Sequence, residues 1–219
     1  MGINDSGLRL LEWVFQQYPV KSVLDLGAQV FYQSYGTATY GSYADTYYRL
    51  KGVERYRCID LNGENGALRL DLSAPQQLEP SDLVTDFGTS EHVGAYTRED
   101  EVFAVDALND TWVHSEGHRA GIEALYNCWT TKYTSSSLLI VSANPATGHW
   151  KDHGHFYYTR AFYDVLCELT GMKVCFLDEL YAMGNTTDGK EICCILDVRG
   201  SHWISLAEFT KAFEHIFPT

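Results

Sequence analysis

The chain has 219 residues, of which 45% are apolar and 14% are aromatic, which excludes a disordered polypeptide. A single domain of this length can bury roughly 70% of the surface of its unfolded chain, so it needs no disulfides or metals to fold. Acidic residues outnumber basic ones by 29 to 16, giving a formal charge of −13. The electrostatic field of this negative charge repels phosphate backbones and anionic membranes, so nucleic acid and membrane partners are disfavoured.

The six cysteines form no C-x-x-C pair, and the sequence therefore predicts neither a zinc site nor a redox dithiol. The N-terminal residues lack the basic-then-apolar pattern of a signal peptide, and no apolar run approaches the length of a membrane span. We expect a cytoplasmic protein with reduced thiols.

In chain order, the first predicted helix is capped by Asp5 or Ser6 and ends before Pro19. A short buried strand, Ser22–Leu26, follows and stops at Gly27. Residues 31–56 contain seven of the fifteen tyrosines and are predicted to form an irregular helix and loop.

The rest of the chain alternates strands with helices. Strands are predicted at 55–60, 67–71, 82–86, 137–143, 173–178 and 191–198. Helices are predicted over 118–132, from near Thr159 to Gly171, and after the capping box Ser205–Glu208.

This alternation predicts an α/β fold with a mostly parallel sheet in one domain, 1–219. The link between the last two strands, residues 179–190, contains Gly184-Asn185 and Asp188-Gly189 and has no helical pattern. A parallel crossover needs about a dozen residues or more, usually helical. We therefore expect an antiparallel hairpin at the end of the sheet.

Acidic residues fall at three strand ends: Asp25, Asp60 and Asp71. Ligands of open α/β sheets bind beyond the carboxyl ends of the strands, and a carboxylate at Asp60 can accept hydrogen bonds from both hydroxyls of a ribose. The first turn, Gly27-Ala28-Gln29, keeps only the first glycine of the G-x-G-x-x-G pattern that a dinucleotide needs. This favours S-adenosylmethionine (SAM), which has no phosphate, over NAD or FAD; a nicotinamide-dependent oxidoreductase is the weaker alternative.

Several segments resemble motifs of the class I SAM-dependent methyltransferases. Val23–Gly27 resembles the first motif, and Cys58–Asp60 the second, with Asp60 in the ribose-binding place. Leu70–Leu72 is similar to the segment whose Asp meets the adenine amino group. Asp82–Gly88 with Ser90–Val93 resembles the fourth-strand motif, and His155–Thr159 a segment after the fifth strand.

The resemblance implies a Rossmann-like three-layer αβα sandwich whose seven-stranded sheet is mostly parallel with the last strand antiparallel. It implies methyl transfer from SAM to a small molecule. The implied cofactor-binding residues are Asp25, Gly27, Ala28, Gln29, Asp60, Leu61, Asp71, Leu72, Asp86 and Phe87. The chain departs from the family at Gln29, which replaces the second glycine, and in the insertion 31–56. A catalytically degenerate binding or scaffold protein on this fold is the alternative.

A base is needed only if the methyl acceptor must lose a proton. His92, after the fourth strand, is the first candidate; a histidine packed at a helix start is the alternative. Residues 149–155 contain three histidines and an aspartate, and we expect a substrate-facing loop with His153 or His155 as base or orienter, a metal site being the alternative. The Tyr-rich insertion 31–56 is interpreted as a lid, or else as a satellite hydrophobic cluster or homodimer contact.

Overall fold

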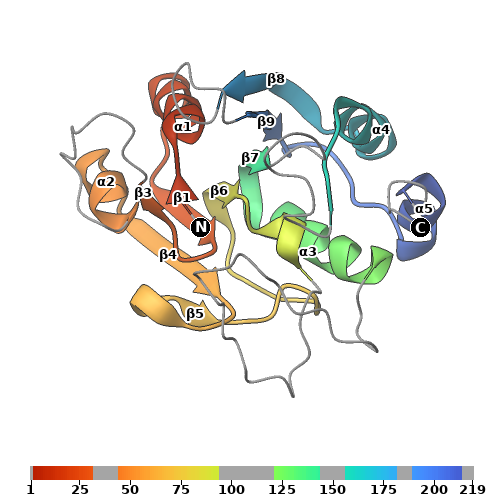
Figure 1. The fold of residues 1–219 in the computed structure, drawn as a ribbon, viewed down its shortest axis with the longest axis horizontal. Coiled ribbons are helices and arrows are strands. Elements are labelled where there is room, and N and C mark those ends of the chain that lie inside the picture. Colours follow the sequence, from red (N-terminus) through yellow and green to blue (C-terminus); the bar gives the residue numbers. More distant parts are fainter. Residues whose placement is uncertain (1, 32–43, 94–120, 144–155, 182–188, 214–219) are drawn as a thin grey trace.

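One seven-stranded sheet organises the computed structural model, which describes residues 2–31, 44–93, 121–143, 156–181 and 189–213. Its strands are β2 (Ser22–Leu26), β4 (Arg55–Asp60), β5 (Leu68–Arg69), β6 (Ser81–Phe87), β7 (Ser136–Ala143), β8 (Lys173–Tyr181) and β9 (Lys190–Asp197). Their order across the sheet is β5-β4-β2-β6-β7-β9-β8 (Figure 1). All neighbours are parallel except β9, which is antiparallel to both β7 and β8. The predicted hairpin and the seven-stranded sheet are confirmed.

Helices cover both faces of the sheet, which gives the expected three layers (Figure 1). On one face lie α1 (Asp5–Gln17) and α2 (Ala44–Leu50). On the other lie α3 (Ile122–Ser135), α4 (Arg160–Thr170) and α5 (Leu206–Phe213). Because side chains alternate along a strand, Val23 packs into the α1–α2 layer while Leu24 and Leu26 pack into the α3–α5 layer.

The helix ends follow local capping chemistry. Thr159 caps α4 by accepting from the amide of Phe162, and α4 ends at Gly171, whose φ of 73° is in the left-handed region. The capping box before α5 is present, because the Glu208 carboxylate accepts from both the amide and the hydroxyl of Ser205. These ends confirm the predictions.

The cap of α1 differs from the prediction. Asn4, not Asp5 or Ser6, is the N-cap, and its Oδ1 accepts from the amide of Gly7. The Ser6 hydroxyl lies instead 2.7 Å from the Glu191 carboxylate at the start of β9. A long-range contact therefore decides which of three adjacent cap-forming residues is used.

Three further features differ from the predicted elements. β5 has only two residues in place of the predicted 67–71. A second, two-stranded parallel sheet joins β1 (Gly2–Ile3) to β3 (Val30–Phe31) and was not predicted. Two 3-10 turns, η1 (Glu64–Gly66) and η2 (Ser90–His92), follow the tips of β4 and β6.

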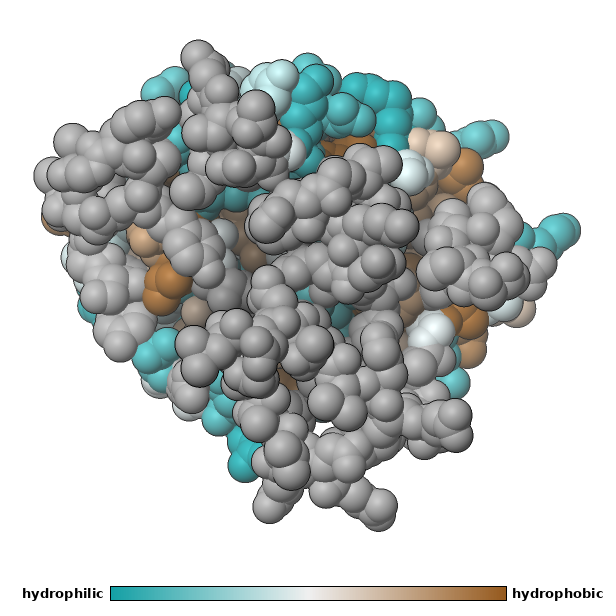
Figure 2. Space-filling view, in the orientation of Figure 1, coloured by the Kyte–Doolittle hydropathy of each residue, from teal (hydrophilic) through white to brown (hydrophobic). Residues whose placement is uncertain are grey.

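Strand β8 forms one edge of the sheet, and hydrophilic residues gather over it in Figure 2. Lys173 and Glu179 are exposed along it, and Arg160 donates to the carbonyl of Leu177. Charged side chains on an edge strand oppose pairing with another chain. Within the described ranges, no helix has the length and apolar character that crossing a bilayer demands.

Candidate functional site

The strand order reverses between β2 and β6, because the chain builds β4 and β5 on one side of β2 and the later strands on the other. Ligands of open α/β sheets bind beyond the carboxyl ends of the strands at such a point. Here the chain turns sharply at Gly27, whose φ is 89° and whose amide donates to the carbonyl of Ile59. The tips of β2, β4 and β6 thereby form the candidate site.

Asp60, the predicted ribose contact, is the last residue of β4. Its Oδ2 accepts from the amide of Ala28 at 2.8 Å and its Oδ1 from the amide of Asn62 at 3.2 Å. The side chain is half-buried. Each carboxylate oxygen can accept a second hydrogen bond, so the group keeps capacity for a diol.

A cavity of about 240 Å³ lies beside Ala28, whose amide donates to Asp60, although Asp60 itself is not among the lining residues. It lies between Ala28 and Gln29 of the first turn, Asp45 of α2, Cys58 of β4 and Asn65 of η1. The structure thus brings Ala28 and Gln29 of the first turn together with Cys58 of the second motif at one cavity.

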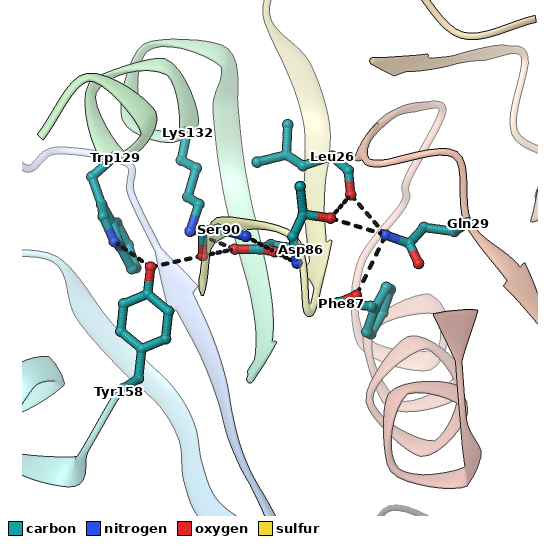
Figure 3. A network of polar contacts seen from close by, with 9 residues as sticks. Leu26, Gln29, Asp86, Phe87, Ser90, Trp129, Lys132 and Tyr158 are labelled. Carbon is teal, nitrogen blue, oxygen red and sulfur yellow. Dashed lines mark hydrogen bonds and ion pairs between the residues drawn. The ribbon is translucent and has the colours of Figure 1, made fainter. Parts of the chain in front are cut away.

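The Gln29 side chain points toward Leu26 at the end of β2 and Phe87 at the end of β6 (Figure 3). It is buried, and its Nε2 donates to the carbonyl of Leu26 at 2.7 Å. The hydroxyl of Thr89 and the carbonyl of Phe87 lie 3.2 and 3.5 Å from the same nitrogen. The Gln29 side chain is therefore anchored to the ends of both β2 and β6.

A buried ion pair supports the tip of β6 (Figure 3). Nζ of Lys132 on α3 lies 2.5 Å from Oδ2 of Asp86 and 4.0 Å from the ring centre of Trp129. The Ser90 hydroxyl donates to the same carboxylate, and it accepts from Tyr158, which in turn accepts from the Trp129 indole. Asp86 thus has internal partners, and its predicted cofactor contact stays a prediction.

Sequence reasoning missed Lys132. The residue stands seven positions after Leu125, in line with Cys128 and Trp129 on the buried face of α3. A lysine at that helical spacing is the signal that points to a buried anion.

Asp25 also has internal partners, because it faces the α1–α2 layer. Its carboxylate accepts from the hydroxyls of Tyr48 and Tyr56, both at 2.9 Å, and from Thr85. Complete burial raises the pKa of Asp25 to about 6, although the three hydroxyl donors oppose this rise. Tyr47 and Tyr48 of the Tyr-rich segment 31–56 are therefore core. Residues 32–43 of that segment lie outside the described residues, and its role as a lid stays a prediction.

The remaining predicted cofactor residues are divided between core and surface. Phe87 packs against Gly7 of α1, and Leu72 is buried in the α3–α5 layer. Leu61 is half-buried, and its carbonyl accepts from Arg69. Asp71 is exposed, and its Oδ1 accepts from the amide of Ser73. Their cofactor contacts stay predictions.

His92 ends η2 and is buried, with its Nε2 3.5 Å from Oε1 of Glu91. The carbonyl of Glu91 accepts from the amide of Phe156, so the segment after β7 returns to η2. His153 and His155, and with them the whole cluster 149–155, lie outside the described residues. Among the residues that are described, no three metal-ligating side chains gather.

Glu191 is a further buried carboxylate, and the sequence does not single it out. It accepts from Asn4, Ser6 and Ser142, and so ties the start of α1 to the end of β7 and the start of β9. Burial raises its pKa, and these donors oppose the rise. Its position at the start of a buried strand gives no sequence signal, because its partners lie far away in the chain.

The seven-stranded sheet, its single antiparallel strand and its three layers define the class I SAM-dependent methyltransferase fold. The structure resembles that of the N-methyltransferase NodS from Bradyrhizobium japonicum WM9 in complex with S-adenosyl-L-homocysteine (SAH). The identity is 11%, the TM-score is 0.53, and the match covers 88% of this chain and 87% of NodS. It also matches a SAM-dependent methyltransferase from Clostridium acetobutylicum ATCC 824, with 10% identity, a TM-score of 0.40, and 86% and 88% of the two chains covered. No protein-family model and no curated protein matches the sequence.

Proposed function

We propose that this protein binds SAM at the carboxyl edge of its sheet and transfers the methyl group to a small molecule. The observation that carries the proposal is the half-buried Asp60 carboxylate beside the first turn, with capacity for a diol, on a fold that NodS shares. The NodS structure is a complex with SAH, the demethylated form of SAM.

The residues at this edge fit the nucleoside part of SAM. Asp60 would accept from the ribose hydroxyls, with Gly27 and Ala28 beneath. Asp71 would meet the adenine amino group, and Leu61 and Leu72 would flank the ring. The amino-acid end would point toward β6, where the amide of Gln29 stands. Asp25, Asp86 and Phe87 would then not touch SAM themselves. They would support the ends of β2 and β6, which border the cofactor.

Bound SAM supplies an electrophilic methyl group on a sulfonium. The protein has to align an acceptor with it, and alignment alone can contribute about 7–11 kcal/mol. Where the acceptor must lose a proton, His92 is the base that we propose, with the Glu91 carboxylate 3.5 Å away to orient its ring. His153 and His155 are further candidates. A cytoplasmic location and a homodimer belong to the same proposal.

Titration calorimetry with SAM and SAH tests the proposal. Asp60→Ala removes two charge-assisted hydrogen bonds to the ribose, so we expect affinity to fall by about a hundredfold or more. Asp178→Ala, an exposed carboxylate on β8, is the matched control and should bind as the wild type does. The proposal is wrong if neither ligand binds the wild type. It is also wrong if Asp60→Ala binds SAM and SAH as tightly as the wild type does. Transfer of labelled methyl groups from SAM to a panel of small acceptors then tests turnover.

A second candidate function is a binding or scaffold protein that has lost turnover. The buried Gln29 amide in the gap between β2 and β6 favours it, because this side chain stands where the amino-acid end of SAM would go. That function predicts no affinity for SAM, or affinity without methyl transfer.

A further inference from the structure

Residues 2–7, here called the N-terminal segment, lie at the carboxyl edge of the sheet, between the first turn and the start of β9. Within this segment β1 pairs in parallel with β3, whose first residue, Val30, directly follows the first turn. Asn4 and Ser6 contact the buried carboxyl group of Glu191 at the start of β9. The segment therefore connects Glu191 to the first turn.

The Ser6 hydroxyl lies between two acceptors. Its Oγ is 2.5 Å from Oδ1 of Asn4 and 2.7 Å from Oε2 of Glu191. The orientation of the Asn4 amide is fixed, because its Oδ1 also accepts from the amide of Gly7 and its Nδ2 donates to Oε1 of Glu191 at 2.6 Å. A hydroxyl has one hydrogen, and an amide oxygen has none. With Glu191 ionised, one of the two short oxygen–oxygen contacts of Ser6 would therefore contain no hydrogen.

A proton on Glu191 supplies the missing hydrogen. Oε2 of Glu191 then donates to Ser6, Ser6 donates to Oδ1 of Asn4, and Nδ2 of Asn4 donates to Oε1 of Glu191, which closes a ring of three hydrogen bonds. The Ser142 hydroxyl, 2.7 Å from Oε2, donates to the acceptor capacity that a protonated carboxyl oxygen keeps. The geometry around Glu191 thus fits a neutral carboxylic acid.

The surroundings of Glu191 also favour its neutral form. Burial raises the pKa of Glu191, and the Glu91 carboxylate of η2 raises it further. Cys193 lies on the same face of β9, and burial raises the pKa of its thiol to about 12, so it stays neutral. The contacts to Glu191 from α1, β7 and β8 come from neutral residues. Among the residues described, no ion pair includes Glu191.

We propose that Glu191 carries a proton in the state that the structure shows, and that this proton latches the N-terminal segment onto the end of β7 and the start of β9. Ionisation opens the latch, because the Ser6 hydrogen turns to the carboxylate and leaves Oγ of Ser6 facing Oδ1 of Asn4 with no hydrogen between them. Asn4 is the N-cap of α1 and directly follows β1, so its displacement loosens both elements. Since β1 pairs with β3, a rise in pH then loosens the first turn. The latch does not rest on the proposed function.

Hydrogen exchange of the N-terminal segment at a series of pH values tests the latch. Opening releases one proton, so between the ordinary pKa of 4.5 and the raised value the ratio of open to closed forms should grow by about tenfold per pH unit. Glu191→Gln keeps an acceptor for Asn4 and a donor for Ser6 but cannot ionise, so its opening should not grow in this way. Glu168→Gln, which replaces an exposed glutamate on α4, is the matched control and should behave as the wild type does.

The quantity to compare is the exchange rate of each protein relative to that of Glu191→Gln at the same pH, because intrinsic exchange and the titration of Asp25 are common to all of them. For the wild type this ratio should rise with pH in residues 2–10 and also in the peptide that contains Gln29 and β3. A ratio that stays constant across the pH series would overturn the latch, and a rise confined to residues 2–10 would overturn its link to the first turn. Glu191→Met, which also cannot ionise, serves as the reference if the glutamine variant does not fold.

Discussion

Nζ of Lys132 lies 2.5 Å from Oδ2 of Asp86, and both side chains are completely buried. The pair joins α3 to the tip of β6, which leads into η2 and His92. A buried ion pair adds little net stability over apolar residues of the same shape, but losing one partner leaves a buried charge without compensation. The tip of β6 therefore depends on both members being present.

We expect Lys132→Met to lower the free energy of unfolding by about 3–5 kcal/mol, because it strands the Asp86 carboxylate. Lys21→Met is the matched control, since Lys21 forms an exposed pair with Glu54 and such pairs contribute about 1 kcal/mol or less. Urea denaturation measures both. Adding Asp86→Asn to Lys132→Met should recover part of this lost stability, because no buried charge then stays unpaired. If the double variant instead loses as much stability as the two single variants together, the ion pair is ruled out.

The buried Asp25 makes stability depend on pH in a predictable direction. Burial raises its pKa to about 6 from the ordinary 3.8. Between these values the folded state holds a proton that the unfolded state has released, so stability falls as pH rises through this window, by roughly 3 kcal/mol in total. Asp25→Asn cannot ionise and should lack this loss.

Denaturation of wild type and Asp25→Asn at a series of pH values from 4 to about 7 checks this expectation. The quantity to follow is the difference between the two proteins, because the raised pKa of Glu191 contributes to both curves. Parallel curves would show that Asp25 is already ionised throughout.

Gly7 and Phe87 are in direct contact, and a Cβ at Gly7 would stand 2.8 Å from Cε1 of Phe87. Alanine in a helix normally stabilises relative to glycine, by about 1 kcal/mol. Here we expect Gly7→Ala to destabilise by about 1–3 kcal/mol, since the ring has to move within a packed layer.

Phe87→Leu should relieve the Gly7→Ala substitution, which a double-mutant cycle measured by thermal unfolding can show. Contact predicts a coupling energy of about 0.5–3 kcal/mol between the two positions. Independent, additive effects would contradict the packing of Phe87 on α1.

Local chemistry was enough to predict much of the fold. The link 179–190, which has two turn-forming glycines and no helical pattern, correctly indicated the hairpin. The Ser205–Glu208 box correctly placed the start of α5. The cap of α1 could not be predicted, because Asn4, Asp5 and Ser6 all have the right chemistry. The choice follows from Glu191, which lies 187 positions from Asn4 in the chain.

For the candidate site, the sequence predicts where residues stand along the backbone but not where their side chains point. Gly27 and Asp60 could be placed from strand ends, and the sequence showed that Gln29 replaces a glycine. It did not show that the Gln29 side chain folds back onto the carbonyl of Leu26. Likewise Asp25 stands near a strand end in the sequence. Because side chains alternate between the two faces of the sheet, its carboxylate points into the α1–α2 layer, toward Tyr48 and Tyr56. The direction of each side chain depends on packing across the sheet, and the spacing of residues along the chain does not reveal that packing.

The position of β9 between β7 and β8 has a consequence for how the protein is made. β8 is synthesised before β9 but pairs with the body of the sheet only through it. Until β9 inserts, β7 and β8 both expose strand edges that can pair with other nascent chains. Coexpression with a chaperone should therefore matter most for variants that slow β9 insertion, such as substitutions at Cys194 or Ile195 in its buried centre.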